Sequence, residues 1–424
     1  MRQRERWMAP SGSGRRGSSY GGSHRSGGRR YRVAIALVVL VVIALGVVQI
    51  LRPVPKPTYA SSVQIPAATT PAPKVPWPSQ GSGVLEIPGV GVLSSFGTSQ
   101  PIPIASVAKM MTAYLILKDH PLALGQNGPS ITLTQADYNT YRQQLAAQDS
   151  VMAVAPGEVL TEYQALEGLL LPSADNLAIT LANWDAGSVT AFVAKMNATA
   201  RKLGMTHTIY TDPSGLDAKT QSTPADQLKL AQLFEANPVL AQIASFPQAT
   251  LPVAGVVYNV DYDLGSNGIV GIKTGSTPSG GNFAFDAQIS QGPTPYSVIG
   301  VVLGQQGPQP LITALDVGKQ VAASLGAEPG TQTIIRQGQA VGSLVVPGQA
   351  RSVPVVADAT VSMIDWQGLP TSSAVSLFHL NYPIAKGAVV GHLSITVGEQ
   401  HKTIALRAGG AVNAPTLSWR LRRL

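Results

Sequence analysis

The chain has 424 residues, with 30 Lys and Arg against 22 Asp and Glu, 43 Gly, 32 Pro and no Cys. This length and this Pro and Gly content suit two or three domains with Pro/Gly-rich connections. A sequence without cysteine excludes a disulfide framework, thiolate metal sites and a cysteine nucleophile. Residues 1–32 hold nine Arg and one Glu and so account for the whole net charge of +8. The other residues balance to zero, which excludes the basic surface of a nucleic-acid-binding protein.

A membrane anchor is predicted near the N-terminus. Residues 33–51 contain one polar side chain, Gln49, and a helix of this length crosses most of a bilayer core at about 1.5 Å per residue. Arginines are denser before this run than after it, so we expect a cytoplasmic N-terminus and a single pass through the cell membrane. A cleaved signal peptide is the alternative, although the apolar run and the tail before it are long for one. Residues 1–32 are rich in Arg, Gly and Ser and are predicted to be disordered.

Residues 52–82 are predicted to form a linker. Eight prolines lie between residues 53 and 78, and this density favours extended polyproline II structure. We expect a semi-rigid stalk that lifts the following domain off the outer face of the membrane.

Residues 83–326 are predicted to form a mixed domain of the α+β class. Strands are expected at 83–93, 96–104, 269–274, 282–289 and 296–303. Helices are expected at 105–118, 161–171, 175–184, 188–203, 224–235 and 311–325. Helices between an early and a late set of strands indicate an antiparallel sheet with helical layers. Asp226 follows Thr223 and Pro224 in a helix-start pattern, so its role is predicted to be structural.

Residues 327–424 are predicted to form a small β-sandwich-like domain of short strands. The spacing of Gly338, Val341, Gly342 and Leu344 recurs 49 residues later in Gly387, Val390, Gly391 and Leu393. Two similar hairpin units are therefore predicted in this domain, for which we expect a role as spacer or binding module.

The first motif that carries chemistry is Ser106 with Lys109, at the start of an apolar helix. A spacing of three residues stacks the two side chains on one helical face. A partly desolvated lysine can accept the proton of a serine hydroxyl, which nucleophilic acyl transfer requires. A capping serine followed by a surface lysine is the structural alternative, but burial of a lysine among apolar residues favours a functional role.

The second motif is Ser173 with Asp175 and Asn176, where one apolar helix ends and another begins. A hydroxyl and an amide at this point can relay a proton and hold a substrate, whereas the structural alternative is a helix N-cap at Ser173. The third motif runs from Lys273 through Thr274, Gly275, Ser276 and Thr277 at the end of a strand. A cation and hydroxyls beside a glycine suit a carboxylate-bearing substrate that lies along the strand.

Together, in this order, the three motifs resemble the penicillin-recognising serine transferases. The segments IASVAKMMTAYLIL, LLLPSADN, TDPSGLD and GIKTGSTPSGGNF are similar to the D-alanyl-D-alanine carboxypeptidases, which are low-molecular-weight penicillin-binding proteins. The resemblance spans residues 83–325, and the β tail looks like the domain that often follows.

The resemblance implies an acyl-enzyme mechanism on peptidoglycan stem peptides. Ser106 would attack the bond before the last D-alanine with Lys109 as base, and Ser173 with Asn176 or Asp175 would shuttle a proton and hold the peptide. The motif of Lys273 and Thr274 would bind the terminal carboxylate, and the N–H groups of Ser106 and Ser276 would form the oxyanion hole. β-Lactams would be covalent inhibitors, and neither a cofactor nor a metal is implied.

One departure from the family pattern leaves alternatives open. The second motif usually reads Ser-x-Asn, but Asp175 holds the third position here and the amide comes one residue later. A catalytically silent wall-binding or scaffold protein is therefore the first alternative. A β-lactamase is the second, although no Glu for deacylation lies between Glu167 and Glu235. Endopeptidase action on cross-links is a variant of the carboxypeptidase interpretation.

Overall fold

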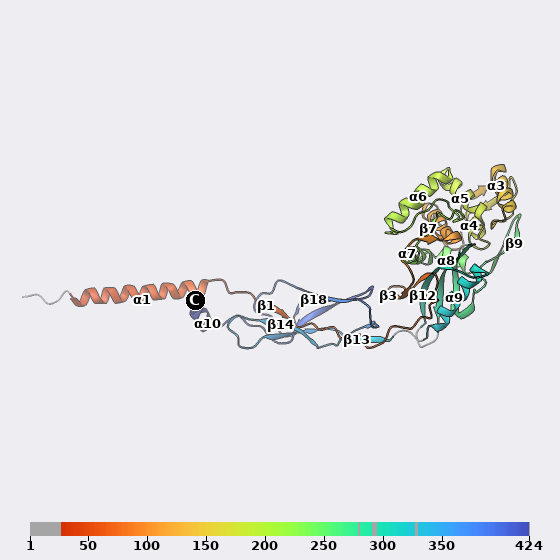
Figure 1. Ribbon diagram of the computed structural model, residues 1–424. Helices are drawn as coiled ribbons and strands as arrows, with labels where there is room; N and C mark the ends of the chain where they lie inside the picture. Colours follow the sequence, from red (N-terminus) through yellow and green to blue (C-terminus); the bar gives the residue numbers. More distant parts are fainter. Residues whose placement is uncertain (1–26, 279, 291–294, 327–329, 424) are drawn as a thin grey trace, which may run out of the picture.

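The computed structural model describes residues 27–278, 280–290, 295–326 and 330–423. A long helix, an elongated β domain and a mixed α and β domain follow one another along the molecule (Figure 1). Most of the tail that the sequence predicts to be disordered, residues 1–26, lies outside the described residues. At the predicted boundary between the mixed domain and the β domain, residue 327 also lies outside the described residues.

Helix α1 (Gly27–Leu51) contains the predicted anchor and begins six residues before it. An 18-residue window within its stretch Arg29–Leu51 has a mean hydropathy of 3.1, and its apolar side chains are exposed. Length and composition therefore allow α1 to cross a membrane. The short helix α10 (Leu417–Arg422) lies against the end of α1 (Figure 1), where Gln49 Nε2 donates a hydrogen bond of 2.7 Å to the carbonyl oxygen of Arg423.

The Pro-rich segment after α1 is part of the β domain. Its strand β1 (Thr58–Ser61) pairs antiparallel with β14 (Ala340–Val345), and the Tyr59 hydroxyl donates to the Val341 carbonyl at 2.8 Å. Further along, Gln332 bonds to the backbone of residues 67 and 69. The prolines predict a semi-rigid stalk, but strand pairing and side-chain hydrogen bonds hold this segment against the β domain.

The β domain contains a six-stranded antiparallel sheet in the order β1-β14-β15-β19-β18-β17, accompanied by the separate antiparallel pair β13 and β16. Its remaining strands are β13 (Thr331–Ile335), β15 (Val353–Ala357), β16 (Val361–Ile364), β17 (Thr371–Leu377), β18 (Val389–Val397) and β19 (Gln400–Ala408). The internal repeat corresponds to β14 and β18. A register shift precedes Gly342 in one and Gly391 in the other, and the apolar residues of both repeats are buried.

The mixed domain is built on a five-stranded sheet in the order β10-β11-β12-β2-β3, with each neighbouring pair antiparallel. Its strands are β2 (Ser82–Ile87), β3 (Gly91–Phe96), β10 (Ile269–Thr277), β11 (Gly280–Ile289) and β12 (Tyr296–Gln305). The antiparallel α+β class predicted from the sequence is confirmed. The first hairpin turns earlier than predicted, because Gly89 takes φ +72° and Val90 N donates to the Ile87 carbonyl at 2.9 Å.

Helices cover both faces of this sheet. Helix α9 (Pro310–Ser324) packs on the face that carries Leu85 and Phe283, while α7 (Pro224–Glu235) and α8 (Pro238–Ala244) pack on the face that carries Val84 and Ile272. Val84 and Leu85 are adjacent in one strand, so they point to opposite faces. Asp226 is structural as predicted: it accepts from His207 N and Thr208 Oγ1 at the start of α7.

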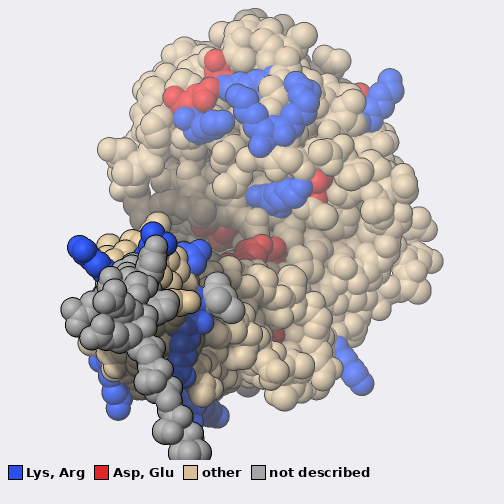
Figure 2. All heavy atoms as spheres, turned by 90° about the vertical axis from the view of Figure 1, so that its left-hand side faces the viewer, with Lys and Arg blue, Asp and Glu red and all other residues tan. Residues whose placement is uncertain are grey.

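The rest of the domain is a helical layer above the second face (Figure 1). It contains η1 (Ala105–Ala108), α2 (Lys109–Asp119), α3 (Gln135–Ala146), α4 (Glu162–Leu170), α5 (Asp175–Ala186) and α6 (Val189–Lys202). Short strand pairs join its loops: β4 (Ile102–Pro103) with β7 (Gln221–Ser222), β5 (Ser130–Thr132) with β6 (Val159–Thr161), and β8 (Gln248–Leu251) with β9 (Gly255–Tyr258). A further turn, η2 (Ser266–Gly268), precedes β10. Figure 2, seen from the anchor end, shows that Lys and Arg outnumber Asp and Glu on this side.

Candidate active site

The backbone of Ser106 is held between two glycines. A Cβ at Gly215 would lie 1.8 Å from the Ala105 carbonyl oxygen, and one at Gly275 would lie 2.8 Å from Ser106 N. Both positions therefore need glycine, because the loop and strand β10 pack directly on the backbone of η1. The predicted helix at 105–118 accordingly opens with this short 3₁₀ turn before α2 begins at Lys109.

Two residues with left-handed backbone conformation lie next to the predicted catalytic residues. Ala105 has φ +48° and Ser173 has φ +61°, two of the four non-glycine residues with positive φ in the described ranges. Such a conformation costs about 1–3 kcal/mol and is found most often where a site requires it. Ala105 precedes the predicted nucleophile, and Ser173 opens the second motif. The N-cap of α5 is Ala174, so Ser173 is not the capping residue that the structural alternative required.

Lys109 is the centre of the site and is fully buried. Its Nζ lies 2.7 Å from Ser106 Oγ, 2.6 Å from Asp175 Oδ1 and 3.4 Å from Ser173 Oγ. The structure therefore brings the first and second motifs together around one amine. A hydroxyl within hydrogen-bond reach of an amine, which a carboxylate orients in turn, is the arrangement of an activated nucleophile.

A fourth partner of Lys109 was missed in the sequence. The carbonyl oxygen of Ser214 lies 3.2 Å from Lys109 Nζ. Asp212 shapes this loop, because its carboxylate accepts from the N–H and hydroxyl of Ser214 and from Thr220 Oγ1. The segment TDPSGLD is similar to the family, but the identity of a residue does not reveal where its backbone carbonyl points.

Asp175 and Asn176 point in different directions. Asp175 pairs with Lys109 inside the site. Asn176 accepts a hydrogen bond from Met152 N and donates one to the Met152 carbonyl, each 3.0 Å long. Of the two residues between which the sequence could not decide, Asp175 is therefore the one that faces Lys109. Its charge is balanced by that lysine. Asn176 fastens the start of α5 to the segment around Met152.

Lys273 is buried on β10, and its Nζ donates to the Thr274 carbonyl at 3.1 Å. Burial and, after it, the nearby charge of Lys109 lower the pKa of Lys273 to about 7, against the opposing effect of Asp175 and Asp261. Thr274 is buried beside it, whereas Ser276 is exposed and Thr277 is half-buried. The predicted third motif thus presents a cation and hydroxyls on the strand that touches Ser106 through Gly275.

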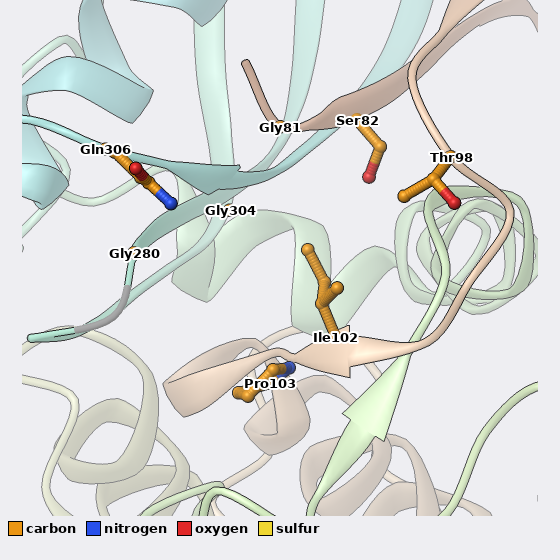
Figure 3. A pocket seen from close by; sticks show the side chains of 8 residues that line it. All are labelled: Gly81, Ser82, Thr98, Ile102, Pro103, Gly280, Gly304 and Gln306. Carbon is orange, nitrogen blue, oxygen red and sulfur yellow. The ribbon is translucent and has the colours of Figure 1, made fainter.

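A hollow of about 250 Å³ lies beside the site, next to β4. Figure 3 shows the residues that line it: Gly81, Ser82, Thr98, Ile102, Pro103, Gly280, Gly304 and Gln306. No ionisable side chain lines it, so the chemistry belongs to the cluster around Lys109 instead. Within the described ranges, no group of three or more His, Asp or Glu is arranged to hold a metal ion.

Comparison with known proteins assigns the family. The D-alanyl-D-alanine carboxypeptidase family, peptidase S11, matches residues 85–307. The chain belongs to this family. It is 34% identical over 219 residues to the D-alanyl-D-alanine carboxypeptidase DacB2 of Mycobacterium tuberculosis, covering 50% of this chain and 70% of that protein. It is 30% identical over 220 residues to a D-alanyl-D-alanine endopeptidase of Pseudomonas aeruginosa, covering 50% of this chain and 67% of that protein.

Solved structures share the fold of this family member. Penicillin-binding protein 5 of Haemophilus influenzae aligns with a TM-score of 0.54 at 21% identity, over 83% of this chain and all of that one. A peptidoglycan synthesis regulatory factor, PBP3, of Streptococcus pneumoniae aligns with a TM-score of 0.55 at 21% identity, over 80% of this chain and all of that one. The family match and the curated relatives confirm the predicted family resemblance and the predicted serine hydrolase.

Proposed function

We propose that the protein is a membrane-anchored serine D-alanyl-D-alanine carboxypeptidase that removes the terminal D-alanine from peptidoglycan stem peptides. The observation that carries the proposal is the 2.7 Å contact between Lys109 Nζ and Ser106 Oγ, in a buried site that also holds the cation Lys273. A base, a nucleophile and a carboxylate-binding cation are the parts that this hydrolysis needs.

Acylation begins at Ser106. Its Oγ attacks the carbonyl carbon between the last two D-alanines while its proton moves to Lys109, which acts as base in its neutral amine form. Asp175 then stabilises the ammonium that forms, as a carboxylate does beside other catalytic bases. The N–H groups of Ser106 and Ser276 donate to the oxyanion, and each such donor contributes about 3 kcal/mol to the rate.

The acyl-enzyme forms when the peptide bond breaks. The proton passes from Lys109 through Ser173 to the nitrogen of the departing D-alanine, which the 3.4 Å distance between Lys109 and Ser173 supports. Lys273, Thr274 and the backbone at Gly275, with the hydroxyls of Ser276 and Thr277, hold the terminal carboxylate and the peptide. Water then hydrolyses the ester, releases the shortened peptide and returns the proton to Ser106.

The anchor places this chemistry outside the cell. Helix α1 would cross the cell membrane once, with the short N-terminal part in the cytoplasm, because arginines are denser on that side. The basic side in Figure 2 faces the anchor, which suits an anionic lipid surface. The substrate would be the peptidoglycan beyond that membrane.

The test is mass spectrometry of the protein after incubation with penicillin, beside a Ser106→Ala control, with D-alanine release from a pentapeptide measured in parallel. We expect an adduct on Ser106 and release of D-alanine, both lost in the control. An adduct that hydrolyses rapidly without D-alanine release would indicate a β-lactamase. A folded protein that forms no adduct would instead support the hypothesis of a catalytically silent wall-binding or scaffold protein.

Cross-linked peptides belong in the same assay. One relative is named an endopeptidase, so cleavage of a dimeric stem peptide is the second candidate activity. A higher kcat/KM on the dimer than on the pentapeptide would assign endopeptidase as the main reaction, and the reverse would assign carboxypeptidase.

A further inference from the structure

Thr112 is a fully buried residue of α2 that none of the three motifs contains. It follows Lys109 by three residues, which puts both side chains on one face of the helix. Its Oγ1 donates a hydrogen bond of 2.6 Å to the carbonyl oxygen of Pro213, and Lys109 Nζ lies 3.2 Å from the carbonyl oxygen of the next residue, Ser214. Helix α2 therefore holds two consecutive carbonyl groups of the loop at residues 211–217.

The partners of Lys109 differ in what they can offer to its amine. A neutral amine has two N–H donors and one lone pair. The ionised carboxylate of Asp175, at 2.6 Å, and the carbonyl of Ser214 can only accept hydrogen bonds, so together they take both N–H groups. The lone pair is left for a hydroxyl, and Ser106 Oγ at 2.7 Å lies closer than Ser173 Oγ at 3.4 Å. The Ser214 carbonyl thus directs the lone pair of the base to the hydroxyl proton of Ser106.

The direction of this carbonyl is fixed by three hydrogen bonds around it. The peptide group before it is held at both ends, because Pro213 O accepts from Thr112 and Ser214 N donates to the carboxylate of Asp212 at 3.2 Å. On the far side, Leu216 N donates to the same carboxylate at 2.9 Å. The two bonds to Asp212 lie within the loop, whereas the bond from Thr112 ties the loop to α2.

We propose that Thr112 is a positioning residue for the base Lys109. Its hydroxyl keeps the Ser214 carbonyl on one N–H of the amine, so that the lone pair meets the proton of Ser106. The assignment rests on the proposed function. Without this hydroxyl, the Pro213 carbonyl loses its buried donor and the loop is no longer held to α2. An N–H of Lys109 then turns to Ser106 Oγ, and an amine that donates to this oxygen cannot take its proton.

The experiment measures penicillin acylation of the full chain, of Thr112→Val and of Thr112→Ser over a range of penicillin concentrations. This range separates the acylation rate constant from the dissociation constant of the initial complex. Valine has the shape of threonine without the hydroxyl, and we expect its rate constant to fall roughly tenfold while the dissociation constant stays within about twofold. Serine keeps the donor, so Thr112→Ser should retain at least about half of the wild-type rate constant.

Thr180→Val is the matched control. Thr180 is also buried in the helical layer, but its Oγ1 donates to Asp137 of α3 at 2.7 Å. The control should lose stability to urea as Thr112→Val does and keep the wild-type acylation rate constant.

Three results would overturn the assignment without touching the proposed function: wild-type acylation by Thr112→Val, an equal loss in Thr112→Ser, or a weaker initial complex with an unchanged rate constant. Thr112→Ala replaces the valine variant if that does not fold, with the same expectation. A wild-type protein without an adduct would overturn the proposed function and this assignment together.

Discussion

Asp175 and Asn176 are adjacent in the chain but contact different parts of the molecule, and their substitution should separate activity from stability. Asp175→Ala leaves Lys109 buried without its carboxylate, so we expect acylation of Ser106 to fall at least about 100-fold. Asn176→Ala removes two hydrogen bonds to Met152 and should lower the free energy of unfolding by about 2 kcal/mol. Penicillin acylation rates and urea denaturation of both variants check this.

The opposite pattern would contradict the assignment of the two side chains. Acylation that survives in Asp175→Ala but is lost in folded Asn176→Ala would place the amide in the cleft. Asp175→Asn serves as the conservative control, since it keeps a hydrogen-bond acceptor for Lys109 and should retain more activity than Asp175→Ala.

Most of the candidate site could be predicted from residue types, because Ser106, Lys109 and Lys273 each stand in a short motif. The choice between Asp175 and Asn176 could not, since it depends on how the chain enters α5 after the left-handed Ser173. The Ser214 carbonyl also escaped prediction. It reaches the site through a loop whose path is set by the tertiary hydrogen bonds of Asp212.

At the scale of one element, the start of α4 makes the stability of the fold depend on pH. Glu162 is fully buried under the loop at residues 127–129, and neither carboxylate oxygen has a hydrogen-bond partner among the described residues. Burial raises the pKa of Glu162 to about 7. The folded state thus holds this proton more tightly than the unfolded state does, and its contribution to stability is lost as the pH rises from about 4.5 to 7.

Glu162→Gln should remove this loss of stability. We expect the variant and the wild type to have similar free energies of unfolding at about pH 5, and the variant to be more stable by about 2 kcal/mol at about pH 8. Urea denaturation at both pH values measures the difference. Glu399 is exposed, and Glu399→Gln is the control that should show no such change. A variant that is equally stable or weaker at the higher pH would contradict the prediction.

The longer elements with apolar periodicity were predicted well, while the short apolar helix α8 and the polar elements were missed. Helix α7 has the predicted bounds because Thr223, Pro224 and Asp226 mark its start. Helix α3 was missed, since Gln144 is its one buried residue and no apolar stripe reveals it. Strand β1 was missed because prolines surround it and its pairing partner lies some 280 residues away in the sequence.

For the whole molecule, Tyr59 tests whether the Pro-rich segment belongs to the β domain. Tyr59→Ala removes the hydrogen bond to Val341 and the ring that packs against Gly342, and should destabilise the β domain by about 2 kcal/mol. Acylation of Ser106 should be unchanged, because this contact lies in the β domain. Thermal unfolding and the penicillin acylation rate check the two expectations. A parallel loss of acylation would show that the two domains are coupled.

The pairing of β1 with β14 affects how the catalytic domain stays joined to α1, because β14 comes almost 300 residues later in the chain. An enzyme on a single-chain tether is shed by one proteolytic cut in that tether. Here a cut between residues 62 and 82 would leave the catalytic domain joined through its C-terminal side to a sheet that still holds β1, and to α10 against α1. The catalytic domain of the severed protein would therefore stay attached to α1 until that sheet opened, so the fold acts as a safeguard against release by proteases.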